Sequence, residues 1–79
     1  MVRDETRDEL WTLVDNLNEK HRLVVILRLT YDMTVSEISQ VLGVTEKTVY
    51  TRLYDAFAQL RALIHLRPEF SHLREEVQL

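Results

Sequence analysis

The stretch from Thr34 to Leu53 constrains the fold more than any other part of the sequence, because it surrounds the only glycine, Gly43. A glycine can adopt the left-handed conformation that ends a helix. Two positions later, Thr45 can cap a new helix by accepting from the amide of Lys47 or Thr48. The apolar residues on both sides have helical spacing and close a small core: Ile38, Leu42, Val44, Val49 and Leu53. The pattern predicts a helix-turn-helix, whose second helix enters the major groove of DNA.

Helical periodicity and capping residues predict the other elements. Apolar residues at helical spacing predict a first helix over about residues 5–17. Asn18 is the expected N-cap of a second helix over about residues 19–30, which is apolar on most sides and therefore central or covered by a partner. The third helix begins at Thr34 or Val35, and the fourth runs to about residue 66 because Pro68 follows. Phe70, Leu73 and Val77 have the spacing of a final short turn or helix that folds back.

The sequence therefore predicts an all-α fold: a four-helix domain that contains a helix-turn-helix and a short C-terminal extension. We expect residues 1–79 to form a single domain, with a core over about residues 8–66 and the extension over residues 67–79. The longest apolar run, Leu23 to Leu27, is too short to span a bilayer, so we expect no membrane association.

Composition argues against catalysis and against a cofactor. The chain has no cysteine, which is compatible with a cytoplasmic location. Its three histidines (His21, His65 and His72) do not have the spacing of a metal site, so we expect no metal. No serine lies in a Gly-x-Ser-x-Gly context. We therefore expect a binding protein and not an enzyme.

The charge is unusual for a protein that binds DNA alone. The net charge is −3, whereas neutralisation of phosphates by Lys and Arg supplies most non-specific DNA affinity. Residues 46–61 carry three basic and two acidic side chains, so the fourth helix is mildly positive within an acidic chain. We expect weak DNA affinity in isolation and a partner that holds the domain at its site.

The fourth helix sorts into two faces. Val49, Leu53, Ala56, Phe57 and Leu60 are expected to point inward. Lys47, Tyr50, Thr51 and Tyr54 are expected to point outward, where a cation, hydroxyls and aromatic rings suit base edges, thymine methyl groups and phosphates. Tyr54 could instead pack at the edge of the core. Arg52 is placed to reach the backbone of DNA, and Ser36 to bind a phosphate at the start of its helix.

A larger set of residues resembles region 4 of bacterial sigma factors, most closely those of the extracytoplasmic-function type. This set contains Leu13, Leu17, Arg22, Val25, Leu27, Glu37-Ile38, Leu42-Gly43, Thr48-Val49, Arg52-Leu53, Ala56 and Leu60-Arg61. The resemblance implies recognition of the promoter −35 element by the fourth helix, docking on the flap of the RNA polymerase β subunit, and an anti-sigma factor as a further partner. The residues that match DNA contacts of the family are Ser36, Thr45, Glu46, Lys47, Thr48, Tyr50, Thr51, Arg52 and Tyr54.

Three positions depart from the family pattern. Asn18 replaces a common proline, which should alter only the connection between the first two helices. Tyr50 and Asp55 stand where basic residues are frequent, so the promoter affinity or sequence preference is expected to be unusual. No residues resemble the region 2 of a complete sigma factor, which leaves an excised domain and a small natural protein both open.

Two other functions fit the same pattern. A stand-alone regulator of the LuxR type shares the four-helix layout, and the continuation of the fourth helix could serve as its dimer helix through Ala58, Leu60, Leu63 and Ile64. The third reading is a sigma-like protein-interaction module that binds an anti-sigma factor.

Overall fold

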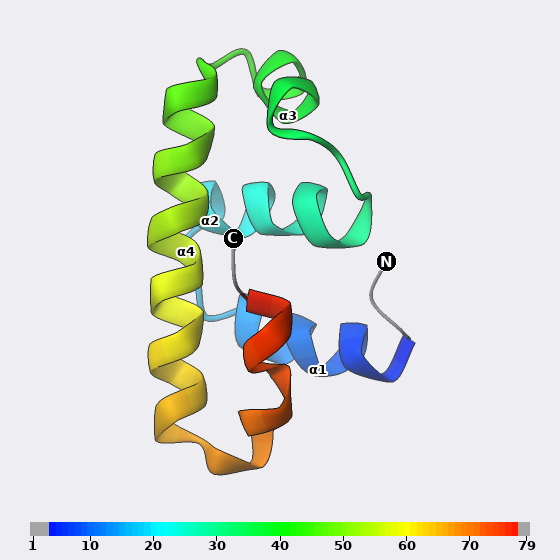
Figure 1. Ribbon diagram of the computed structural model, residues 1–79, viewed down its shortest axis with the longest axis vertical. Coiled ribbons are helices and arrows are strands. Elements are labelled where there is room, and N and C mark those ends of the chain that lie inside the picture. Colours follow the sequence, from blue (N-terminus) through cyan, green and yellow to red (C-terminus); the bar gives the residue numbers. More distant parts are fainter. Residues whose placement is uncertain (1–3, 78–79) are drawn as a thin grey trace.

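One long helix, α4 (Glu46–Leu66), runs along one side of the molecule, and the shorter elements pack beside it (Figure 1). The computed structural model describes residues 4–77. Its other elements are α1 (Asp4–Val14), α2 (Glu19–Val25), a π-helical segment η1 (Ile26–Thr30), α3 (Val35–Leu42) and a 3₁₀ helix η2 (Pro68–Val77). These described residues contain helices and turns but no strand, so the predicted all-α fold is confirmed.

Capping residues determine where the helices begin. The side chain of Asn18 accepts a hydrogen bond from the amide of His21 at 3.0 Å, as expected for the start of α2. Thr34 caps α3 and Thr45 caps α4, where its hydroxyl accepts from the amide of Thr48 at 3.1 Å. The backbone of Gly43 is left-handed with φ 68°, and it ends α3 as the sequence predicts.

The first helix is shorter than the prediction of residues 5–17. It ends at Val14, and the chain continues in a tight turn in which the amide of Asn16 donates to the carbonyl of Leu13 and that of Leu17 to that of Val14. Polar Asp15 and Asn16 favour such a turn over a helix interior. Leu17 is buried at the end of this turn, although it lies outside the helix.

The second helix widens before it ends. It is regular from Glu19 to Val25 and then continues as η1, where the amide of Tyr31 donates to the carbonyl of Ile26, five residues back. Asp32 follows with a left-handed φ of 53°, and the Arg28 guanidinium donates to the carbonyl of Met33 at 3.2 Å. This irregular turn redirects the chain into α3.

A single core joins the elements. The inward face of α4 is buried along most of its length: Val49, Leu53, Ala56, Phe57, Leu60 and Ile64. Residues of α1, α2 and α3 pack on it, and η2 folds back as predicted to add Leu73 and Val77, both fully buried. The helix-turn-helix thus lies at one end of the molecule, away from η2 (Figure 1).

Candidate DNA-binding surface

The first half of α4 has one buried face and one exposed face. Val49 and Leu53 are fully buried, whereas Tyr50 and Tyr54 are 54% and 64% exposed. Lys47 and Thr51 are exposed on the same outer face. The alternative position of Tyr54 at the core edge is therefore wrong, and the outer face is open to a ligand as large as a DNA duplex.

Several hydroxyl groups predicted to contact DNA also make hydrogen bonds within the helix. Thr45 Oγ1 accepts from the amide of Thr48 and lies 3.0 Å from Thr48 Oγ1. Thr51 Oγ1 donates to the carbonyl of Lys47 at 3.0 Å. Because a hydroxyl has one donor and two acceptor positions, Thr51 retains acceptor capacity toward a base or a bridging water. Thr48 is half-buried, and both its amide and its hydroxyl contact the capping residue Thr45, so it takes part in the N-cap of α4 as well as in the surface.

A shallow hollow lies on the outer face of α4. It is lined by Tyr50, Thr51, Tyr54 and Asp55, and it is wide open to solvent. The two aromatic rings can contact thymine methyl groups, whereas the carboxylate of Asp55 beside them would repel a phosphate at close range. Asp55 was identified from the sequence only as a departure from the family pattern, and the structure places it directly in this hollow.

The start of α3 is a poorer phosphate-binding site than the sequence predicts. Ser36 is exposed there as expected, but the amide of the next residue, Glu37, is already bonded to the Thr34 hydroxyl. The backbone hydrogen bond from Thr34 and the contact with its side chain lower the pKa of Glu37, so its carboxylate is negative at neutral pH. A phosphate at Ser36 would therefore meet a like charge.

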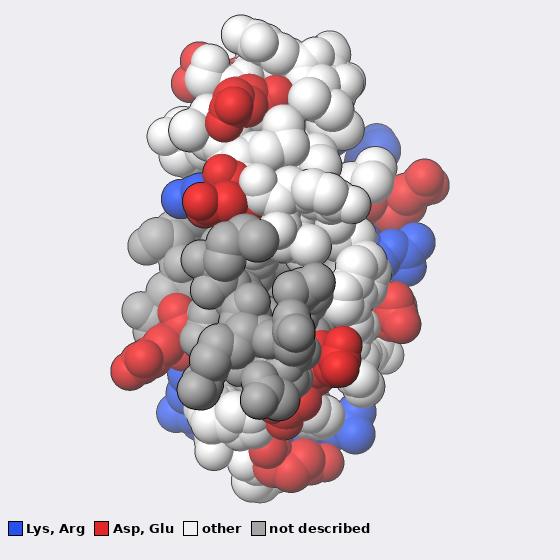
Figure 2. Space-filling view, turned by 90° about the vertical axis from the view of Figure 1, so that its right-hand side faces the viewer, with Lys and Arg blue, Asp and Glu red and all other residues white. Residues whose placement is uncertain are grey.

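The remaining predicted contacts lie at the edges of the same surface. Glu46 is exposed in the first turn of α4, and Arg52 is half-buried beside the outer face. On the described part of the face in Figure 2, which views the molecule from the right-hand side of Figure 1, Asp and Glu are interspersed with Lys and Arg. The end formed by α3 shows uncharged and acidic side chains there. This face lies opposite α4, and its mixture of charges agrees with the acidic net charge of the chain.

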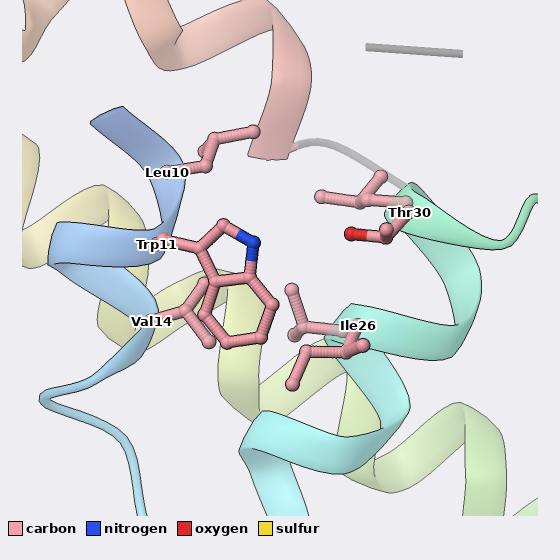
Figure 3. A pocket seen from close by; sticks show the side chains of 7 residues that line it. Leu10, Trp11, Val14, Ile26 and Thr30 are labelled. Atoms are coloured by element: carbon pink, nitrogen blue, oxygen red, sulfur yellow. The ribbon is translucent and has the colours of Figure 1, made fainter. Parts of the chain in front are cut away.

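A second recess lies at the other side of the domain, between α1 and the α2–η1 segment. Its lining is mainly apolar: Leu10, Trp11, Val14, Val25, Ile26, Leu29 and Thr30. We call these residues the α1–α2 groove. The indole of Trp11 points from α1 into the space between the helices and fills much of it (Figure 3). The remaining volume of about 20 Å³ holds a group the size of one water molecule. Trp11 is nevertheless 37% exposed, and Leu23 on α2 is 40% exposed.

The residues offered by the sequence as a dimer helix are mostly unavailable. Leu60 and Ile64 are fully buried in the core to which η2 contributes, and Leu63 is half-buried, whereas Ala58 is exposed. Among the described residues no cluster of potential ligands could hold a metal ion, and none of the helices there is long and apolar enough to cross a membrane.

The fold and the exposed face of α4 define a helix-turn-helix protein that binds DNA. Comparison with protein families gives the more specific class: the model of "Sigma-70, region 4" matches residues 7–60, which is more than half of the chain. The chain therefore belongs to the sigma-70 region 4 family and is a sigma factor-like, DNA-binding module of transcription. No curated protein and no solved structure matches it significantly.

Two structural features could not be predicted from the sequence, namely the α1–α2 groove and a contact between α1 and η2. The α1–α2 groove depends on how α1 packs against the α2–η1 segment. A contact between His72 Nε2 and Glu9 Oε2, at 2.9 Å, joins residues 63 positions apart. No local pattern signals such a pair, because it forms only when η2 folds back.

Proposed function

We propose that this chain recognises the −35 element of a bacterial promoter with the outer face of α4 while it is docked on the flap of the RNA polymerase β subunit. The observation that carries the proposal is the sharp division of α4 into a buried and an exposed face directly after the turn at Gly43. Membership in the region 4 family supports the same role. The role is one of binding and positioning, without catalysis, and it implies a cytoplasmic location.

The charge distribution supports a function within a larger assembly. The outer face of α4 presents Lys47, with Arg52 at its edge, and also Asp55. Few phosphates can be neutralised by so few cations, so the sequence-independent part of the DNA affinity is small. A partner that holds the domain close to the promoter replaces that missing affinity by raising its effective concentration.

The α1–α2 groove is the surface we propose for the polymerase flap. An amphipathic helix can place one apolar side chain on a groove of this kind, beside the exposed edge of Trp11. Because the groove and the outer face of α4 belong to different helices at different parts of the domain, both could be occupied together. The extracytoplasmic-function type and an anti-sigma factor as partner are further parts of the proposal, which rest on the sequence resemblance.

The test uses the whole chain with core RNA polymerase and a random library of DNA duplexes. We expect selected duplexes to share a −35-like motif only when polymerase is present. Lys47→Ala should weaken the binding of the selected duplex and lower the slope of log K against log salt by about 0.9. Lys20→Ala removes an exposed cation from α2 and is the matched control.

Two results would contradict the proposal. Equal effects of Lys47→Ala and Lys20→Ala would show that the outer face of α4 does not approach DNA. A dimer that binds palindromic duplexes tightly without polymerase would instead favour the stand-alone regulator. Docking is measured separately, by titration of the isolated β flap into the chain.

A further inference from the structure

The segment η2 lies beyond residue 60, where the family match ends, yet it is part of the core. Its apolar residues Leu73 and Val77 are fully buried in the same cluster as Leu60 and Ile64 of α4. Uninterrupted 3₁₀ geometry over ten residues is uncommon, because its hydrogen bonds are poorer than those of an α-helix. Tertiary contacts must therefore hold η2 in place.

Two polar contacts fix η2 to different helices. The guanidinium of Arg61 on α4 donates to the backbone carbonyl of Val77 at 3.0 Å, which satisfies an acceptor at the end of η2. His72 Nε2 lies 2.9 Å from Glu9 Oε2 on α1. The segment thus connects the C-terminal half of α4 with α1, and Figure 1 shows it lying beside α1.

The first helix needs such support. It has only eleven residues, and helices of that length are marginal without tertiary packing. Glu9, which contacts His72, directly precedes Leu10 and Trp11 in the sequence. These two residues and Val14 form the α1 side of the α1–α2 groove. The position of α1 consequently sets the width of the groove and the exposure of Trp11.

We infer that η2 is a positioning element for the α1–α2 groove, with His72 as the positioning residue that holds α1 through Glu9. The groove has the shape required by its partner only while η2 is packed on α1 and α4. This inference rests on the proposed function in one respect, namely that the polymerase flap occupies the groove. Residues outside the family match thereby contribute to the docking of the domain, because they hold α1 in position.

The experiment compares three variants of the whole chain. His72→Ala removes the contact with Glu9, and because His72 is exposed the domain should still fold. His72→Gln keeps a nitrogen donor at a similar distance from the backbone. Arg67→Ala is the matched control, since its ion pair with Glu69 at 3.5 Å is local and does not reach α1.

Two readouts separate the inference from the proposed function. Acrylamide quenching of Trp11, the only tryptophan, reports on the groove without any partner. Binding of the isolated β flap reports on docking. His72→Ala should increase the quenching constant and weaken flap binding by about two- to fivefold, the size expected for one exposed polar contact. His72→Gln should restore both values, and Arg67→Ala should change neither.

Each other outcome either overturns the inference or separates it from the docking proposal. Unchanged quenching and flap binding in His72→Ala would overturn the inference, as would changed quenching with unaltered flap affinity. An equal response of Arg67→Ala would also overturn it, because the effect would then not come from the contact with α1. If the wild-type chain does not bind the flap while His72→Ala still increases quenching and His72→Gln reverses it, the docking proposal fails but the support of α1 by His72 stands.

Discussion

The side chains of Thr34 and Glu37 each accept a hydrogen bond from the other residue's backbone amide at the start of α3. The amide of Thr34 donates to Glu37 Oε1 at 2.8 Å, and the amide of Glu37 donates to Thr34 Oγ1 at 3.1 Å. This capping box fixes the first turn of the helix that precedes the turn at Gly43. Since the backbone hydrogen bond from Thr34 favours the ionised carboxylate, the pKa of Glu37 lies below its ordinary value of 4.5.

The capping box predicts a pH dependence of stability. A carboxyl group whose pKa is lower in the folded than in the unfolded chain stabilises the fold above the unfolded pKa, and this stabilisation is lost as the pH falls through the folded value. We therefore expect Glu37→Gln to lower the Tm at pH 7, and the difference from wild type to shrink at pH 3. Thermal unfolding followed by circular dichroism measures both values.

The matched control for this prediction is Glu46→Gln. It also removes a carboxylate from the first turn of a helix, but that residue takes no part in a capping box. A difference between wild type and Glu37→Gln that persists unchanged at pH 3 would show that the carboxylate charge is not what stabilises α3.

The features that the sequence predicted correctly depend on residues close together in the chain. Asn18, Thr34, Gly43 and Thr45 each act on a backbone group within five residues, so their types were sufficient to predict the helix boundaries. The faces of α4 follow equally from helical periodicity, which is why the placement of its outer residues was correct.

The features that the sequence did not predict depend on packing between distant elements. Whether Trp11 closes the core or lines a groove depends on the path of η1, and the widening of that segment has no signal in residue type. The contact of His72 with Glu9 requires η2 to fold back over α1. The sequence offers Ile64 as a dimer residue for the same reason, whereas the structure buries it in the core cluster that Leu73 and Val77 of η2 also join.

Gly43 gives a prediction about backbone conformation. A Cβ at this position would have no atom within 4 Å, so the cost of Gly43→Ala comes from the left-handed φ of 68° alone. We expect a loss of about 1 kcal/mol in the free energy of unfolding, measured by urea denaturation. Gly43→Asn should cost less, because asparagine tolerates this conformation. Equal losses in both variants would point to a contact of the turn and not to its φ.

Ile64 and Leu66 test whether the end of α4 belongs to the core of the monomer. Ile64 is fully buried, whereas Leu66 is 75% exposed. Ile64→Ala should lower the free energy of unfolding by about 2–5 kcal/mol, the usual cost of a cavity in a core. Leu66→Ala should change it by less than about 0.5 kcal/mol, as for most surface substitutions.

The concentration dependence of unfolding distinguishes this arrangement from a dimer helix. For a monomer the midpoint should not change with protein concentration, whereas a dimer held together by this part of α4 would become more stable as the concentration rises. A midpoint that rises with concentration in wild type and not in Leu66→Ala would assign Leu66 to an interface.

Asp55 provides the sharpest test of how far the DNA surface extends along α4. Its carboxylate lies in the hollow with Tyr50 and Tyr54, where it would repel a phosphate at close range. Two unit charges 4 Å apart in water interact by about 1 kcal/mol, so Asp55→Asn should strengthen binding of the selected duplex by about two- to fivefold.

Asp15→Asn removes an exposed carboxylate from the turn after α1 and is the control. The gain should diminish as salt is raised, because exposed charges are screened. If Asp55→Asn has no effect at low salt, or no more than Asp15→Asn, the DNA phosphates do not approach this part of α4, and contact is confined to the first two turns around Lys47.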